Sequence, residues 1–155
     1  MGTVAGVEEA QAFGFEATPA AVFPLPVDPE YGDGLGAGRG HEGQDLMAPA
    51  GTPELAVRDA IVIEAGSGDN GGRGNYVSIY SPAVKRTYNY FHMLETPFVQ
   101  AGDHVRAGQR LGLLGCTGSC WGDHLHFEVR QGRDPYGPVL DPTPFLERLQ
   151  RASSR

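Results

Sequence analysis

The stretch HLHFEVR, residues 124–130, alternates polar and apolar side chains and predicts a β-strand with one face in a core. In an extended chain His124, His126 and Glu128 point to one side, and the apolar residues between them point to the other. At a rise of ~3.3 Å per residue, the Cα atoms of the two histidines lie about 7 Å apart. One imidazole can therefore bind a metal ion while the other reaches a group bound to that ion. Two solvent-facing histidines on an edge strand would produce the same pattern.

Short strands separated by glycine-containing turns are predicted over much of the chain from residue 41 onward. In KRTYNYFHML, residues 85–94, the alternation places Tyr88, Tyr90 and His92 on one face. Further strands are predicted within the ranges 55–66, 75–81 and 99–115, the last of which holds two short strands. Such frequent strands and turns are typical of a compact all-β sandwich or barrel.

A helix is predicted only at the C-terminal end, in DPTPFLERLQR at residues 141–151. Asp141 can cap this helix, and Pro142 stands where its missing N–H does no harm. Residues 1–21 show no period and are expected to form an N-terminal arm, disordered or loosely docked. A chain of 155 residues fits one core, so we expect residues 22–155 to form a single domain.

Charge and hydropathy exclude two classes of partner. The formal net charge is −7, and no Lys/Arg cluster forms a stripe, which argues against nucleic acid and against an anionic membrane surface. No apolar stretch is long enough to span a bilayer. The first residues lack the basic start of a signal peptide, and Glu8 and Glu9 interrupt the place of its apolar core.

The stretch HEGQD, residues 41–45, contains a second pair of metal-binding side chains. His41 and Asp45 are four residues apart, so both point to one face of an extended chain, and Gly43 between them leaves room for an ion. A helix would also align the pair, but the surrounding glycines argue against one. Together with a histidine of HLH, this pair offers three ligands, which leaves the fourth tetrahedral position of zinc open for water. That is the pattern of a catalytic site.

Two cysteines stand close together in the stretch CTGSC, residues 116–120. A disulfide between Cys116 and Cys120 would indicate an oxidising compartment, and two free thiols are the alternative. The cysteines could also join His124 and His126 in a structural zinc site of the Cys2His2 type. The H-x-H spacing is tighter than that type of site uses, and His41 and Asp45 would be left without a role.

Three segments, in this order, resemble the signature motifs of the lysostaphin-like (LytM-type) peptidoglycan endopeptidases. They are HEGQDLMAPAGTP at 41–53, YNYFHML at 88–94 and GDHLHFEV at 122–129. The pattern V-x-A-G-D-x-V-x-A-G-Q-x-L-G at 99–112 also resembles the stretch that this family places before its last motif. The similarity extends from about Val22 to Leu149. Each motif is short, but three motifs in the same order are specific together.

The resemblance implies a site and a fold. The zinc ligands would be His41, Asp45 and His126, with one Zn²⁺ per chain, and the catalytic pair would be His92 and His124. The fold would be a small antiparallel β-sandwich of the duplicated hybrid motif type. Its groove would be walled by the loops at 32–40, 66–74 and 116–123.

The resemblance also implies the function. The chain would be a zinc-dependent endopeptidase that hydrolyses peptide bonds in bacterial peptidoglycan, in a stem peptide or a cross-bridge. Such a protein is expected to be monomeric and secreted, periplasmic or associated with the cell wall. The alternative is a non-catalytic regulator of cell-wall hydrolases on the same fold. Because such a regulator needs no open zinc position, the intact ligand set argues against it.

Several nearby side chains have two readings. Glu128 shares the face of His124 and His126, where it can support a ligand or simply be exposed. Tyr88 and Tyr90 can line the groove or belong to the core. Trp121 can serve as a substrate platform, but packing beside the cysteine loop is the simpler expectation. His104 stands in a turn and is expected to be exposed.

Overall fold

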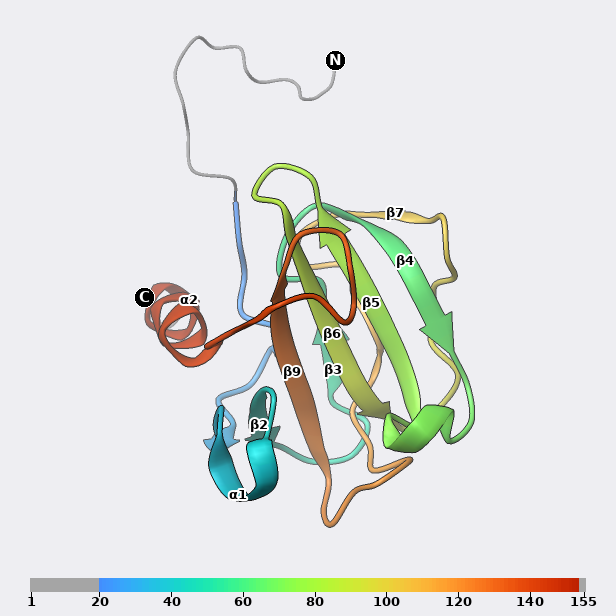
Figure 1. Cartoon of the computed structure of the whole chain (residues 1–155), viewed down its shortest axis with the longest axis vertical. Helices are drawn as coiled ribbons and strands as arrows, with labels where there is room; N and C mark the ends of the chain where they lie inside the picture. Colours follow the sequence, from blue (N-terminus) through green and yellow to red (C-terminus); the bar gives the residue numbers. More distant parts are fainter. Residues whose placement is uncertain (1–19, 154–155) are drawn as a thin grey trace, which may run out of the picture.

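The computed structural model describes residues 20–153 and consists mainly of antiparallel β-sheet, as predicted (Figure 1). All but the last two residues of the predicted N-terminal arm, 1–21, lie outside the described part of the chain. The strands, in chain order, are β1 (Glu30–Tyr31), β2 (Gln44–Met47), β3 (Pro53–Leu55), β4 (Ala60–Gly66), β5 (Asn75–Ser81), β6 (Arg86–Met93), β7 (His104–Val105), β8 (Arg110–Leu113), β9 (His124–Gln131) and β10 (Val139–Leu140).

The larger sheet has eight strands in the order β1-β2-β9-β6-β5-β4-β7, with β10 also paired to β9. Its centre is formed by the long strands β6 and β9, which lie side by side (Figure 1). The register across three neighbouring strands places Asp45 of β2 and Phe91 of β6 on either side of His126 of β9. Because paired residues in a sheet point to the same face, these three side chains lie together.

A second, two-stranded sheet of β3 and β8 covers the opposite face of the larger sheet. The hydroxyl of Tyr90 joins the two sheets, because it donates to the carbonyl of Leu55 at 3.0 Å and accepts from the N–H of Val57 at 3.0 Å. The apolar side chains of HLHFEVR enter the core between the sheets, as its alternation predicted. Fully buried core residues include Leu46, Val57, Ile79, Tyr90, Met93, Leu111, Leu114, Leu125 and Phe127.

The stretch 55–66, within which a strand was predicted, holds β4 and the last residue of β3, which belong to different sheets. β3 ends at Leu55 and β4 begins at Ala60, and the intervening turn carries the chain from the small sheet to the large one. The carboxylate of Asp59 stabilises this turn by accepting a hydrogen bond from the N–H of Ala107 at 2.9 Å. Such a long-range contact leaves no periodic signal in the sequence, so the turn between β3 and β4 was not predicted.

The C-terminal helix α2 (Thr143–Ser153) begins two residues after the predicted start. The Asp141 carboxylate accepts a hydrogen bond from the N–H of Thr143 at 3.1 Å, in agreement with its predicted capping role. The helix buries Leu146 in the core, and Phe145 stacks on Tyr88 with 5.9 Å between ring centroids. Within residues 20–153 no helix has the length and apolar character needed to cross a membrane.

Two short helical segments lie in the glycine-rich loops. The α1 helix (Ala37–Gly40) stands directly before His41, and the 3-10 turn η1 (Asn70–Gly72) connects β4 to β5. The loop at 32–40 was expected to have no regular structure, so α1 was not predicted. The α1 helix lies beside β2 (Figure 1), and its C-cap residue is His41.

Candidate metal and catalytic centre

An open pocket of about 640 Å³ lies on the face of the large sheet opposite the core. All three loops that were predicted to form groove walls contribute to its lining. Gly32, Asp33 and Gly40 come from the first loop, and Gly71, Gly72 and Arg73 from the second. The third loop contributes Ser119, Cys120, Trp121 and Gly122. The predicted site residues form the floor of this groove.

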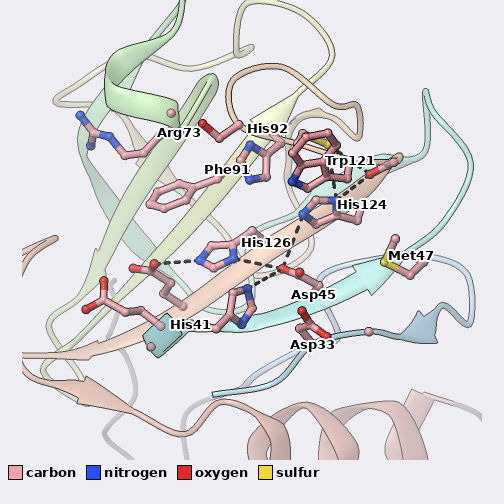
Figure 2. Close-up of a pocket in the computed structure, with 18 of the residues that line it drawn as sticks. Asp33, His41, Asp45, Met47, Arg73, Phe91, His92, Trp121, His124 and His126 are labelled. Atoms are coloured by element: carbon pink, nitrogen blue, oxygen red, sulfur yellow. Dashed lines mark hydrogen bonds and ion pairs between the residues drawn. The ribbon is translucent and has the colours of Figure 1, made fainter. Parts of the chain in front are cut away.

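His41, Asp45 and His126 converge in the pocket (Figure 2). The Asp45 Oδ1 atom lies 3.2 Å from Nε2 of His41 and 3.0 Å from Nδ1 of His126. One potential ligand atom from each residue lies within 4.8 Å of the other two. The structure therefore brings together the three side chains that the motifs singled out, although they come from two segments about 80 residues apart.

Close approach of the β2 and β9 segments requires glycine at position 43. A Cβ atom there would lie 2.5 Å from the carbonyl oxygen of Phe127 and 3.0 Å from Nε2 of His126. The sequence suggested that Gly43 leaves room for an ion. The structure gives it a different task, because the space it leaves is filled by the neighbouring strand and by the imidazole of His126.

Hydrogen bonds fix which ring nitrogen each histidine presents to the groove. Nδ1 of His41 lies 3.0 Å from the carbonyl oxygen of Gly34, so this nitrogen donates and Nε2 keeps its lone pair. His126 has the opposite arrangement, because its Nε2 lies 2.8 Å from the carboxylate of Glu128 and its Nδ1 faces Asp45. In their neutral forms, both imidazoles thus direct an electron pair towards the carboxylate of Asp45.

A buried ionic network stands behind His126. Glu128 accepts hydrogen bonds from Asn89 at 2.8 Å and from Nε of Arg130 at 3.0 Å. Arg130 also donates at 2.9 Å to the carboxylate of Glu42, which lies at the exposed end of this network. Burial raises the pKa of Glu128. Its hydrogen bond and charge interaction with His126 lower this pKa by more than burial raises it, so the net pKa is below the ordinary value. Glu128 is therefore a carboxylate that holds the ring of His126, as one of its two readings proposed.

The charges of the cluster shift two further pKa values. Burial lowers the pKa of His126, but the hydrogen bonds with Asp45 and Glu128 outweigh burial and raise this pKa to about 9. Burial raises the pKa of Asp45, and the hydrogen bond from His126 together with the nearby histidines turns this into a net lowering. Without a cation, the site holds a proton on His126 between two carboxylates.

His92 and His124 lie beside this cluster, with 4.9 Å between their ring centroids (Figure 2). Nδ1 of His92 lies 2.8 Å from the carbonyl oxygen of Thr117, and Nδ1 of His124 lies 2.6 Å from that of Gly122. Each ring therefore donates from Nδ1 to the backbone, and Nε2 of His124 lies 3.5 Å from Oδ1 of Asp45. Burial lowers the pKa of His92 to about 4, so its imidazole is neutral at neutral pH.

The predicted face of His92 was wrong. Tyr88 and Tyr90 point into the core, whereas His92 and Phe91 both line the groove. His92 has a φ of 68°, in the left-handed region that non-glycine residues seldom occupy. This conformation interrupts the alternation of β6 and turns His92 to the side that Phe91 already occupies. A residue in such a conformation is typical of functional sites.

The donor set fits a zinc ion. Two imidazole nitrogens and one carboxylate oxygen are ligands that zinc accepts, and three protein ligands are the number found in catalytic zinc sites. The second ring nitrogen of each ligand histidine is hydrogen-bonded, as is usual for metal-bound imidazoles. The alternative Cys2His2 site does not fit, because Cys116 and Cys120 form a disulfide and their sulfurs are thus unavailable as thiolates.

Sequence reasoning missed several residues that support the site. Phe91 stacks on the imidazole of His126 with 5.0 Å between centroids and 11° between planes. Arg130 could have been found, because it continues the alternation of His126 and Glu128 on β9. Asn89 pairs directly with Glu128 across β6 and β9, and the sequence carries no signal of that register.

Two surface expectations have different outcomes. Trp121 does not pack beside the cysteine loop, because its side chain is fully exposed, at 102% relative accessibility, over the groove (Figure 2). The β-bridge between Gly115 and His124 closes the base of this loop. Trp121 lies farther out in the loop, outside the core. His104 is exposed, as expected, and lies outside the pocket lining.

A groove on an antiparallel sheet, with a His–Asp–His cluster and two further histidines beside it, is an arrangement that fits a metal-dependent hydrolase. Comparison with known families narrows this class. The model of peptidase family M23 matches residues 39–138, and the chain belongs to this family of hydrolases.

Similar proteins carry the names of peptidases. The chain is 37% identical over 116 residues to the DD-carboxypeptidase/endopeptidase Mpg of Neisseria meningitidis, covering 73% of this chain and 26% of that protein. It is 36% identical over 107 residues to lysostaphin of Staphylococcus simulans, covering 69% of this chain and 21% of lysostaphin. The chain thus spans about a quarter of the length of these curated relatives.

Solved structures agree with the fold. The catalytic domain of lysostaphin from S. simulans superposes with a TM-score of 0.69 and 33% identity, covering 77% of this chain and 92% of that domain. A zinc containing peptidase from Vibrio cholerae superposes with a TM-score of 0.66 and 29% identity, covering 79% of this chain and 39% of that structure. The predicted lysostaphin-like fold is therefore confirmed.

Proposed function

We propose that this chain is the catalytic domain of a zinc-dependent endopeptidase that hydrolyses peptide bonds in bacterial peptidoglycan. The observation that carries the proposal is the convergence of His41 Nε2, Asp45 Oδ1 and His126 Nδ1 beside two histidines whose Nδ1 atoms donate to backbone carbonyls, in an open groove. The names of the relatives support the substrate class, since they include DD-carboxypeptidase/endopeptidase, glycyl-glycine endopeptidase and peptidoglycan DD-endopeptidase.

His41, Asp45 and His126 would hold the metal. Zinc at such a site lowers the pKa of a bound water towards ~7 and polarises a carbonyl group. Binding would displace the proton that His126 holds in the metal-free protein, while Glu128 would continue to accept a hydrogen bond from Nε2 of this ring.

His92 and His124 would move protons. Each presents an Nε2 lone pair to the groove, and the backbone carbonyls that accept from Nδ1 stabilise the imidazolium formed when Nε2 takes a proton. A proton accepted from water in the groove can then be given to the amine nitrogen that leaves the cleaved peptide. General acid–base assistance of this kind contributes typically ~10²–10⁴-fold to a rate.

The setting of this reaction would be outside the cytoplasm. A disulfide at Cys116–Cys120 is a bond that persists in oxidising compartments, which include the periplasm and the cell surface. With a net charge of −7, the chain does not attract an anionic polymer by bulk charge, so a peptide substrate would be held in the groove by local contacts.

The first experiment is elemental analysis of the purified protein together with a turbidity assay on purified peptidoglycan. We expect one zinc ion per chain and solubilisation by the wild type, and loss of both in His41→Ala. His92→Ala and His124→Ala should retain zinc and lose most activity. His104→Ala is the matched control, because it removes an exposed histidine outside the groove and should change neither readout.

Two results would contradict the proposal. A wild type that takes up no zinc after metal is added back would favour the alternative, a regulator of cell-wall hydrolases on the same fold. If the protein takes up zinc and cleaves another peptide but not peptidoglycan, the metallopeptidase activity would stand and the proposed substrate would be wrong.

A further inference from the structure

The loop at 116–123 is closed twice. At its base, the isolated β-bridge between Gly115 and His124 joins its two ends, with the N–H of His124 donating to the carbonyl of Gly115 at 3.2 Å. Within the loop, the disulfide links Cys116 to Cys120, with 5.3 Å between their Cα atoms. The loop therefore stands at the start of the strand that carries His124 and forms one wall of the groove.

This one loop supplies the acceptors for both histidines of the proposed catalytic pair. The carbonyl of Thr117 accepts from Nδ1 of His92 at 2.8 Å, and the carbonyl of Gly122 accepts from Nδ1 of His124 at 2.6 Å. The sulfur of Cys120 lies 3.6 Å from the same nitrogen of His124. The two carbonyls thus decide that both rings present Nε2 to the groove.

The two acceptors differ in how they are held. Thr117 is tied to the sheet by its own side chain, whose hydroxyl donates to the carbonyl of Met93 at 2.5 Å and accepts from the N–H of Asn75 at 3.0 Å. Gly122 has no such side chain, and a Cβ built there would meet nothing within 4 Å. The anchoring of Gly122 therefore depends on its neighbours in the chain.

The disulfide is the covalent link nearest to Gly122. Between Thr117 and Gly122 the chain passes through Gly118, whose φ of 78° requires a glycine-like conformation, and through Ser119, whose N–H donates to the carbonyl of Gly72 at 2.8 Å. Cys120 then ties this tip back to the base of the loop at Cys116. Without the disulfide, the segment from Gly118 to Gly122 would be held by the Ser119–Gly72 backbone hydrogen bond and by the bridge between Gly115 and His124.

We propose that the Cys116–Cys120 disulfide is a positioning element for His124, and that the Thr117 side chain has the same task for His92. The effect on catalysis rests on the proposed function, whereas the positioning of the two histidine rings does not. Oxidation of the cysteine pair then sets the activity of the site, because only the closed loop keeps the Gly122 carbonyl on Nδ1 of His124. The loop itself makes no hydrogen bond to His41, Asp45 or His126, and it reaches them only through His124, whose Nε2 lies 3.5 Å from Oδ1 of Asp45.

The structural part is tested by NMR on metal-free protein labelled with ¹⁵N in its histidines. In the wild type we expect slowly exchanging Nδ1–H signals from both His92 and His124. The double variant Cys116→Ala/Cys120→Ala should lose the protected signal of His124 and keep that of His92. Thr117→Val, which has the shape of threonine without its hydroxyl, should show the reverse, and Thr117→Ser should restore the wild-type spectrum.

The catalytic part is tested by steady-state kinetics on a soluble cross-linked peptidoglycan fragment. We expect kcat of the double cysteine variant to fall by roughly 10- to 100-fold, since small misplacements of catalytic groups have effects of this order. Zinc content should stay at the wild-type value. Trp121 belongs to the same loop, so KM should also rise. His104→Ala is the matched control, because this exposed histidine lies outside the groove, and it should leave kcat, KM and the Nδ1–H signals unchanged.

Reduction of the wild type provides the same comparison without a substitution. Tris(2-carboxyethyl)phosphine donates two electrons to the S–S bond, which becomes two thiols, and is oxidised to its phosphine oxide with an oxygen atom from water. If the double variant does not fold, as judged by circular dichroism, the reduced wild type takes its place. Alkylation of the thiols with iodoacetamide keeps the reduced state during both measurements.

The outcomes separate this inference from the proposed function. Retention of the His124 signal after loss of the disulfide would overturn the positioning role, as would a kcat equal to that of the wild type. A fall of kcat in parallel with zinc content would also overturn it, because the loop would then support the metal ligands. If the wild type cleaves no peptidoglycan, the proposed function fails, while the NMR comparison still decides whether the disulfide orients His124.

Discussion

At the scale of single residues, the site depends on which nitrogen each imidazole exposes. Three histidines donate Nδ1–H to backbone carbonyls, whereas His126 has its Nε2 on the Glu128 carboxylate. A carboxylate partner increases the basicity of a metal-bound imidazole, and a carbonyl partner has a weaker effect. Of the proposed ligands, His126 is therefore the one whose metal affinity should depend most on a neighbouring side chain.

Replacing Glu128 by glutamine should weaken zinc binding by roughly 10- to 100-fold, the usual effect of removing such a partner. The amide keeps the shape of the side chain but loses the charge that supports His126. Competition with a chromophoric chelator measures the affinity. Glu64→Gln is the control, since Glu64 interacts with Arg73 and Tyr76 outside the cluster. Equal affinities of the Glu128 variant and the wild type would contradict the assigned role.

Trp121 offers the largest exposed apolar surface beside the groove. An aromatic contact with a peptide is worth about 1 kcal/mol, which corresponds to roughly fivefold in affinity. Trp121→Ala should therefore raise KM by about that factor with kcat unchanged, as measured on a soluble peptide substrate. Phe98→Ala removes an exposed aromatic side chain that does not line the groove and should leave KM unchanged. An unchanged KM in Trp121→Ala would show that this residue does not contact the substrate.

At the scale of elements, the proposed metal site depends on the pairing of β2 with β9. The register sets Asp45 opposite His126, and Gly43 allows the segment before β2 to lie against the backbone of β9. A shift by one residue would turn Asp45 away from the groove, because successive side chains in a strand point to opposite faces. The position of the ligands is thus a property of the strand pair.

Gly43→Ala should separate these two segments, because its Cβ would meet the Phe127 carbonyl at 2.5 Å. We expect a loss of about 1–3 kcal/mol in the free energy of unfolding, as for other overpacked sites, together with weaker zinc binding. Urea unfolding of the metal-free protein measures the first effect and chelator competition the second. Gly122→Ala is the control for stability, since its Cβ would meet nothing within 4 Å. Wild-type stability in Gly43→Ala would show that the backbone adjusts without cost.

At the scale of the whole molecule, the proposed zinc binding would be coupled to protonation. The pKa of His126 is raised from 6.5 to about 9 in the metal-free fold, so the ring is protonated at neutral pH. This proton stabilises the metal-free protein fully below pH 6.5, and that contribution is lost as the pH rises through about 9. Zinc must displace the proton before it can bind Nδ1.

The apparent association constant for zinc should therefore rise about tenfold per pH unit from neutral pH and level off above about 9. Calorimetric titration in two buffers with different ionisation enthalpies should show release of about one proton from the protein at neutral pH. His126→Ala binds zinc weakly and cannot serve as the reference, so the pH series itself is the control. A binding constant that does not change with pH would contradict the raised pKa of His126.

The sequence alone determined the ligand types and most strands of this protein. Alternation in residues 124–130 predicted which side chains of β9 enter the core, because the period of a strand is a local property. The spacing in HEGQD and HLH, read through the family resemblance, singled out His41, Asp45 and His126 before their contacts were known. The five predicted site residues lie together in one groove. Their roles in metal binding and catalysis remain predictions.

Only the tertiary structure decided which supporting groups complete the site. The positive φ of His92 reversed its predicted face, since a single backbone conformation can interrupt an alternation that the sequence still displays. The Asn89–Glu128 pair depends on the register of β6 with β9, and the Thr117 and Gly122 carbonyls depend on how a closed loop folds back. Each is a contact between segments distant in the chain or a property of backbone atoms. Neither kind of feature requires a particular residue type or produces a period in the sequence, so neither can be predicted from it. A metal ligand, in contrast, must be one of a few side-chain types, which the sequence displays.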